Sequence, residues 1–169
     1  RVVILNGSPV ADAFLVAKAK IEKAILITSE VNNKDRIAII GKNGIGKSSI
    51  LKLIMGEEIQ YNGTLKINNN LKISYVSQST KELKGTLKEY ALKNEVEESI
   101  FKAMLSKMGF SKTEFEKDIK ALSEGQKKKV LIAKSISEPA NLYIWDEPLN
   151  YIDILTRLQI EEAILKLVF

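Results

Sequence analysis

The sequence contains no cysteine and no histidine. Without cysteine the chain has no disulfide framework, thiolate metal site or thiol nucleophile, and without histidine it has no imidazole base and no histidine-bound zinc. Apolar runs are only a few residues long, whereas a helix that crosses a bilayer needs ~20 residues. The apolar start Val2–Leu5 is also too short for a secretory signal. We therefore expect a cytoplasmic chain with no direct membrane insertion.

The composition is that of an ordinary globular domain. The chain has 169 residues, of which 45% are hydrophobic and 28% are charged. This length suits one domain, and these fractions argue against a disordered chain or a coiled coil. Lys and Arg number 26 and Asp and Glu number 21, so the net charge is +5. That excess suits a polyanionic partner, but it also suits a plain solvated surface.

Two kinds of sequence follow one another along the chain. Apolar, β-branched runs separated by Gly and Asn predict strands, and segments rich in Lys, Glu and Leu predict helices. We expect strands at 14–17, 24–28, 36–40, 64–67, 71–76 and 142–145, with another beginning at 167. We expect helices at 49–55, 87–108, 112–121, 125–137 and 154–166, the second of them stopped by Gly109. The pattern predicts an α/β chain, residues 1–169, with a core of 14–79 and 123–169 and a helical insert at 80–122.

A glycine-rich segment between a strand and a helix matches the phosphate-binding pattern G-x-x-x-x-G-K-[ST], the P-loop. Glycines let backbone N–H groups turn toward phosphates, and the helix N-terminus adds partial positive charge. Lys47 would meet the β- and γ-phosphates of ATP as a catalytic cation, and the Ser48 hydroxyl would bind Mg²⁺. The alternative is a structural turn. The predicted nucleotide-binding residues are Gly41, Lys42, Asn43, Gly44, Ile45, Gly46, Lys47, Ser48 and Ser49.

Two adjacent carboxylates follow the apolar run Leu142–Trp145. Asp146 suits the Mg²⁺ shell, directly or through water, and Glu147 suits the deprotonation of an attacking water. By themselves they could equally be exposed acids at the end of a strand. Behind a P-loop they favour ATP hydrolysis.

Two weaker signals depend on their order in the chain. Leu122-Ser123-Glu124-Gly125-Gln126 opens a helix, and Ser123 with Gln126 alone would be a capping box. Gln78 follows a predicted strand and alone would be a polar surface residue. In the order P-loop, Gln78, Ser123 and Asp146-Glu147, the sequence resembles the ATP-binding cassette (ABC) family, a P-loop NTPase (RecA-like) fold with an antiparallel β subdomain and an inserted α-helical subdomain.

The resemblance implies roles for these residues. Gln78 would be a catalytic residue that reaches Mg²⁺ and the attacking water. The family's signature is L-S-G-G-Q, with Glu124 here in place of its first glycine. In the family two cassettes meet head to tail, so Ser123, Gly125 and Gln126 would contact the nucleotide of a second cassette. Asp153 would lie across the interface between the cassettes.

Two features resemble the ABC-F branch, which has paired cassettes and no membrane domain. Gly63 and Gln78 are only 15 residues apart, and transporter cassettes are longer there. Residues 147–153 resemble E-P-x-N-x-[LI]-D rather than the transporters' E-P-x-S-x-L-D. The stretch 122–163 looks like the second cassette of ABC-F proteins that protect the ribosome from antibiotics, which implies rRNA as partner. The alternatives are the ATPase subunit of a transporter and a nucleotide-gated scaffold that barely hydrolyses ATP.

The sequence also departs from the family. The turn at 18–23, where the family has an aromatic residue that stacks on adenine, has none. The family's switch histidine is missing, and the chain reaches Phe169 where that strand should begin. We expect the chain to belong to a longer protein with two cassettes.

Overall fold

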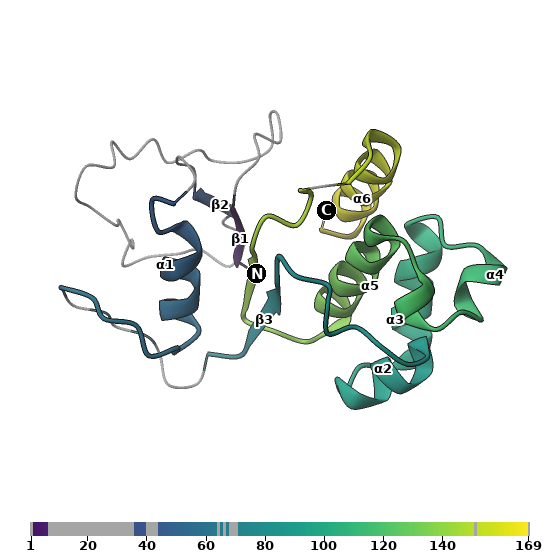
Figure 1. Ribbon diagram of the computed structural model, residues 1–169, viewed down its shortest axis with the longest axis horizontal. Helices are drawn as coiled ribbons and strands as arrows, with labels where there is room; N and C mark the ends of the chain where they lie inside the picture. The colour runs from purple at the N-terminus through teal and green to yellow at the C-terminus, as the bar shows by residue number, and fades with distance from the viewer. Residues whose placement is uncertain are drawn as a thin grey trace. The chain divides into compact units, whose positions relative to one another are not determined.

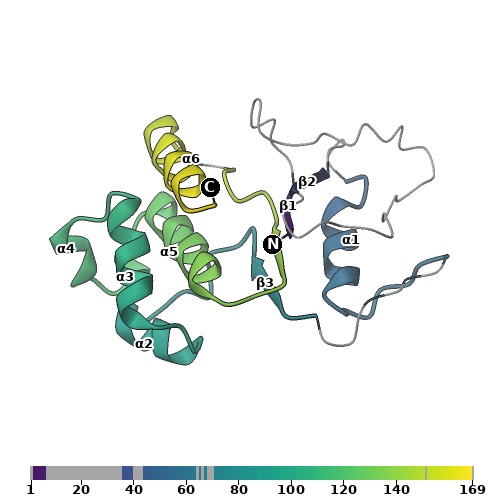
Figure 2. The same ribbon diagram turned by 180° about the vertical axis from the view of Figure 1, so that it is seen from behind.

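The computed structural model describes residues 2–6, 36–39, 44–63, 65, 67, 71–150 and 152–168. These residues divide into two compact units. The first, which we call the sheet unit, takes in residues 1–75 and 140–147, and the second, the helical unit, takes in 76–139 and 148–169. Figure 1 shows the elements of both units, and Figure 2 shows them from behind. The predicted core of 14–79 and 123–169 divides the chain differently, because contacts group α5 (Glu124–Ser137) and α6 (Ile154–Val168) with the helices.

The sheet has four strands in the order β2-β1-β4-β3. Its strands are β1 (Val2–Asn6), β2 (Arg36–Ile39), β3 (Ile73–Val76) and β4 (Leu142–Trp145). β1 pairs in parallel with β2 and with β4, and its register on β4 sets Val2 opposite Leu142. All four residues of β4 are buried, as expected for a strand inside a parallel sheet.

The strands predicted at 36–40, 71–76 and 142–145 are confirmed as β2, β3 and β4. The central strand β1 was not predicted from the sequence. The predicted strands at 14–17 and 24–28, and part of that at 64–67, lie outside the described residues.

Helix α1 (Lys47–Ile54) packs on this sheet through Leu51. Leu51 forms a buried cluster with Leu142 and Ile144 of β4. The helix ends at Gly56, whose φ of 85° permits a Schellman motif: its N–H donates to Leu53 and that of Glu57 to Lys52. The P-loop helix is therefore anchored on the strand that leads to Asp146.

The helical unit contains α2 (Leu87–Lys93), α3 (Glu98–Lys107), α4 (Lys112–Phe115), the 3₁₀ helix η1 (Ile119–Ala121), α5 and α6. α3 lies beside α5 in both views (Figures 1 and 2). The core of the helical unit is made of fully buried side chains from several helices: Phe101, Leu105, Met108, Ile119, Val130, Ile132 and Ile160. No helix in the described part of the chain is both long and apolar enough to cross a membrane.

The single helix predicted over 87–108 is wrong. α2 ends with Asn94 as C-cap, and Glu95 takes a left-handed φ of 54°. The Glu95 N–H donates to Leu92 O and the Val96 N–H to Ala91 O, which is a Schellman motif without glycine. Val96 is 7% exposed, so burial of its side chain supports the turn that breaks the helix.

Two other boundaries also differ from the prediction. The helix expected over 112–121 splits into α4 and η1, because the Asp118 carboxylate accepts a bond from the Lys120 N–H and so competes with helix continuation. The strand expected from 167 is wrong, because α6 continues to Val168 with no Gly or Pro to end it.

Candidate functional site

A turn that contains two glycines leads into the N-terminus of α1. Gly44 and Gly46 have φ of 80° and 99°, a left-handed backbone that glycine adopts without strain. Gly46 is the N-cap and offers no side-chain bond to the helix, whereas Thr86 caps α2 and Ser123 caps α5 with their hydroxyls. Gly46 thus has no side chain with which to cap the first N–H groups of α1, and a phosphate is a suitable acceptor for N–H groups at a helix N-terminus.

Two residues far apart in the sequence meet beside this helix end. The Ser48 hydroxyl donates to Asp146 Oδ1 over 3.2 Å. Asp146 is 4% exposed and follows β4, and Lys47, 7% exposed, precedes Ser48 at the start of α1. Of the other predicted P-loop residues, Ile45 and Ser49 lie in the described turn and helix, while Gly41, Lys42 and Asn43 lie outside the described residues.

Tyr75 belongs to the same site, although the sequence analysis did not select it. Burial raises the pKa of Tyr75 to about 12, with further contributions from the charges of Asp146 and Glu57 and from a hydrogen bond to Asp146. The sequence signal that could have found it is a phenol at the end of a buried strand, which needs a polar partner.

Glu147 follows Asp146 with an unusual backbone. Its φ is 47°, in the left-handed region that costs a non-glycine residue roughly 1–2 kcal/mol. Strained residues of this kind gather at functional sites, because the surrounding structure holds them in place for their chemistry. The strain supports a specific task for the Glu147 carboxylate, which is the residue that the sequence predicts to be the catalytic base.

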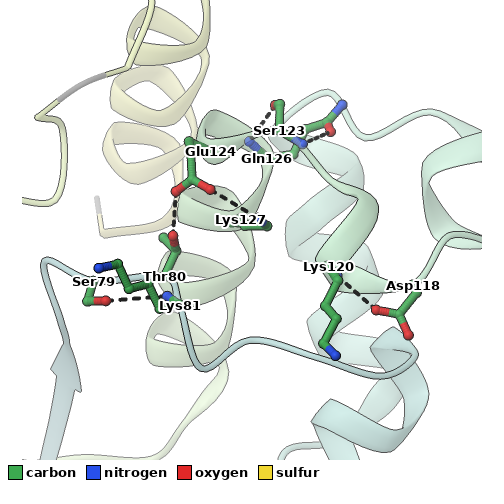
Figure 3. Close-up of polar contacts among 9 residues, drawn as sticks. All are labelled: Ser79, Thr80, Lys81, Asp118, Lys120, Ser123, Glu124, Gln126 and Lys127. Atoms are coloured by element: carbon green, nitrogen blue, oxygen red, sulfur yellow. Dashed lines mark hydrogen bonds and ion pairs between the residues drawn. The ribbon is translucent and has the colours of Figure 1, made fainter.

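Ser123, Gly125 and Gln126 lie at the start of α5, in the helical unit. The capping box is confirmed: Ser123 Oγ accepts from the Gln126 N–H over 3.2 Å, and the Ser123 N–H donates to Gln126 Oε1 over 2.8 Å (Figure 3). A hydroxyl that accepts this bond still has its own proton to donate. Capping and phosphate contact are therefore compatible roles for Ser123.

Gly125 and Gln126 are also held by neighbours in this unit. A Cβ at Gly125 would lie 3.3 Å from the Thr156 methyl group of α6, so the two helix starts approach closely. Gln126 Nε2 donates to the Glu114 carboxylate. Asp153, predicted for an interface between cassettes, caps α6: its carboxylate accepts from the Thr156 N–H over 2.9 Å, which lowers the pKa of Asp153.

Gln78 is exposed and lies shortly after the end of β3, in the helical unit. Its backbone carbonyl accepts from Lys128 Nζ over 2.8 Å. Beside it is a cavity of about 480 Å³ whose lining includes three lysines. The lining residues are Gln78, Ser79, Thr80, Lys81, Leu83, Lys120, Glu124 and Lys127.

Comparison with known families identifies the chain. The sequence profile of the ABC transporter family matches residues 26–150, about three-quarters of the chain. The chain belongs to this family. The motif order predicted this family, and the α/β fold with a parallel sheet is that of an ABC ATPase domain.

The relatives of this cassette include several ABC-F proteins. "ABC transporter F family member 2" of Arabidopsis thaliana is 34% identical over 140 residues, which cover 79% of the cassette and 21% of that protein. "Ribosome protection protein VmlR" of Bacillus subtilis is 29% identical over 140 residues, which cover 79% of the cassette and 25% of that protein. The chain thus spans about a quarter of the length of its curated relatives.

Solved structures agree with the fold. A structure titled "RNase-L Inhibitor" superimposes with a TM-score of 0.61 at 29% identity, over 76% of the cassette and 25% of that chain. The complex of an archaeal ribosomal stalk protein with the ribosome recycling factor aABCE1 gives a TM-score of 0.61 at 28% identity, over 76% of the cassette and 25% of that chain.

Proposed function

We propose that this cassette binds and hydrolyses ATP as one half of a paired site in an ABC-F protein that acts on the ribosome. The observation that carries the proposal is the hydrogen bond between Ser48 and Asp146 beside an α1 N-terminus whose N-cap is a glycine. That geometry offers a phosphate its donors and a cation its oxygen ligands at one place. The ABC-F and ribosome-associated relatives support the choice of branch and partner.

The residues at this place fit Mg²⁺. A hydroxyl oxygen and a carboxylate oxygen 3.2 Å apart are hard ligands of the kind that Mg²⁺ binds together with phosphate oxygens. Ser48 and Asp146 would hold the ion, with Gln78 as a further predicted ligand. When bound, Mg²⁺ neutralises charge that develops on the β- and γ-phosphates.

The protein's own groups then perform the hydrolysis. Lys47 and the first N–H groups of α1 hold the phosphates of ATP, and Gln78 orients the attacking water. Glu147 accepts the proton of that water as the oxygen attacks the γ-phosphorus, and the bond from the γ-phosphorus to the β,γ-bridging oxygen breaks, so that ADP and phosphate are released. The Ser123 hydroxyl of a second cassette donates to the γ-phosphate from the opposite side, together with the N-terminus of its α5, where Gly125 and Gln126 lie.

A ribosomal partner is supported by charge as well as by the relatives. Lys81, Lys120 and Lys127 line the cavity beside Gln78, and the chain carries a net charge of +5. Phosphate oxygens of rRNA are suitable partners for such lysines, and binding would then weaken steeply with salt. Because a relative is named as a ribosome protection protein, antibiotic resistance by target protection is the biological role that we propose.

The test is sedimentation with ribosomes in the full-length protein. Glu147→Gln keeps ATP bound but cannot accept the proton, so the closed, ribosome-bound form should accumulate in ATP and not in ADP. Adding Lys81→Glu and Lys120→Glu to this variant should release it at lower salt. Exposed Lys93→Glu, on α2, is the matched charge control. If the trapped protein sediments with membranes in both nucleotides and ribosomes remain bare, the proposal fails and the transporter alternative stands.

A further inference from the structure

The start of α5 is tied to the segment that carries Gln78. The Glu124 carboxylate accepts a hydrogen bond from the Thr80 hydroxyl and, over 3.0 Å, one from Lys127 Nζ (Figure 3). One turn further along α5, Lys128 Nζ donates to the carbonyls of Ser77 over 3.0 Å and of Gln78 over 2.8 Å. Together these contacts join residues 77–80 to the first two turns of α5, which begins directly after Ser123.

Thr80 is buried, so its hydroxyl group needs a hydrogen-bond acceptor within the protein. Thr80 is 6% exposed, so its hydroxyl loses most of its water and needs an acceptor in the protein. The Glu124 carboxylate is the acceptor that it has. Glu124 is largely exposed, and its ion pair with Lys127 is therefore a weak, solvent-screened contact. The hydrogen bond from the buried Thr80 hydroxyl, rather than the ion pair with Lys127, therefore fixes the position of the Glu124 carboxylate.

We propose that Glu124 is a positioning residue that fixes the signature serine Ser123 relative to Gln78. The inference rests on the proposed function, in which Gln78 serves the nucleotide of its own cassette and Ser123 serves that of its partner. A shift of residues 77–80 would then be passed directly to the start of α5. Each nucleotide site would sense the other through the Thr80–Glu124 contact.

This role belongs to the residue that departs from L-S-G-G-Q. A glycine at position 124 has no side chain that could accept a hydrogen bond from the Thr80 hydroxyl. Of the contacts described above, only those of Lys128 would then join α5 to residues 77–80. The departure therefore adds a connection instead of merely tolerating a larger residue.

The experiment uses the full-length protein and four variants. Glu124→Gly and Thr80→Val each remove the contact, whereas Glu124→Gln keeps a carbonyl oxygen that accepts from Thr80. Exposed Glu82→Gln changes a carboxylate two residues from Thr80 and is the matched control. ATPase kcat and KM, and hydrogen exchange of the peptide containing residues 77–81, are measured for each.

We expect Glu124→Gly and Thr80→Val to lower kcat about five- to tenfold with an unchanged KM for ATP. The double variant should be no slower than either single variant, because both remove one contact. Exchange in 77–81 should accelerate in these variants only, and Glu124→Gln and Glu82→Gln should resemble the wild type.

Additive losses in the double variant, or unaltered exchange in 77–81, would overturn the inference. Thr80→Val decides the matter if Glu124→Gly fails to fold. A wild-type protein without any turnover would refute the proposed function instead, and the exchange data alone would then decide whether the contact positions this segment.

Discussion

At the scale of single residues, chemistry is assembled from groups that are remote in the sequence. Ser48 lies on α1 and Asp146 follows β4, yet their oxygens are in hydrogen-bond contact. The motif patterns predicted both residues, because phosphate and metal binding restrict the residue type at each position. Tyr75 escaped prediction, because its part in the site is a contact with Asp146 and no motif specifies it.

Lys47→Ala should weaken ATP binding by about ten- to a hundredfold, because it removes a charge-assisted contact to the phosphates worth roughly 1.5–3 kcal/mol. Calorimetric titration of the chain with ATP measures this. The control is Lys52→Ala on the same helix, an exposed lysine 3.5 Å from Glu57, which should bind ATP as the wild type does. Equal affinity for Lys47→Ala and wild type would refute the phosphate-binding role.

At the scale of elements, helix starts were easier to predict than helix ends. The Thr86 and Ser123 capping boxes are formed as their sequences indicate, because the side chain that caps the helix is local to it. The end of α2 was missed because its Schellman motif uses Glu95, and the sequence signal for such an end is normally glycine. β1 was missed for another reason: its pairing partners lie far along the chain, so four apolar residues carry no local evidence of a central strand.

Glu95→Gly should stabilise the chain by about 0.5–1 kcal/mol, because glycine relieves the left-handed strain and loses part of that gain to backbone entropy. Urea denaturation gives the difference. Glu95→Ala removes the same carboxylate but keeps a Cβ, so it should not be stabilised. A stability gain of the same size in Glu95→Ala would assign the effect to charge rather than to backbone conformation.

Tyr90 of α2 predicts an alkaline effect. Burial, together with the charge of Glu138, raises the pKa of Tyr90 to about 12. Between pH 10 and 12 the unfolded tyrosine loses its proton first, so the stabilisation is complete below pH 10 and is lost as pH rises toward 12. The full shift corresponds to at most about 2.7 kcal/mol.

Urea midpoints between pH 9 and 11.5 would measure this loss. Tyr90→Phe should fall less steeply than the wild type across that range. Tyr75, whose pKa is also about 12, should leave a residual slope in the variant. Identical slopes for variant and wild type would show that the hydroxyl of Tyr90 plays no part in the alkaline loss.

At the scale of the whole molecule, the proposed mechanism needs two cassettes. A single chain holds Glu147, but the signature serine that completes its site would come from another cassette. The chain alone should therefore hydrolyse ATP slowly, with turnover per chain rising with protein concentration as transient pairs form. Phosphate release measured over a hundredfold dilution tests this, and rapid turnover that is independent of concentration would contradict the paired site.

The pairing of β1 with β4 also has a consequence for the order of events during synthesis. Val2 of β1 is opposite Leu142 of β4, so β4 leaves the ribosome long after β1, the strand with which it pairs. α2 packs on the adjacent α3, and this local pair can form early, whereas contacts between remote strands form slowly. Asp146 follows β4, so Ser48 gains its partner at the same late moment. A growing chain would thus acquire its affinity for Mg²⁺-ATP only when β4 joins the sheet, and nucleotide binding would report that the sheet has formed.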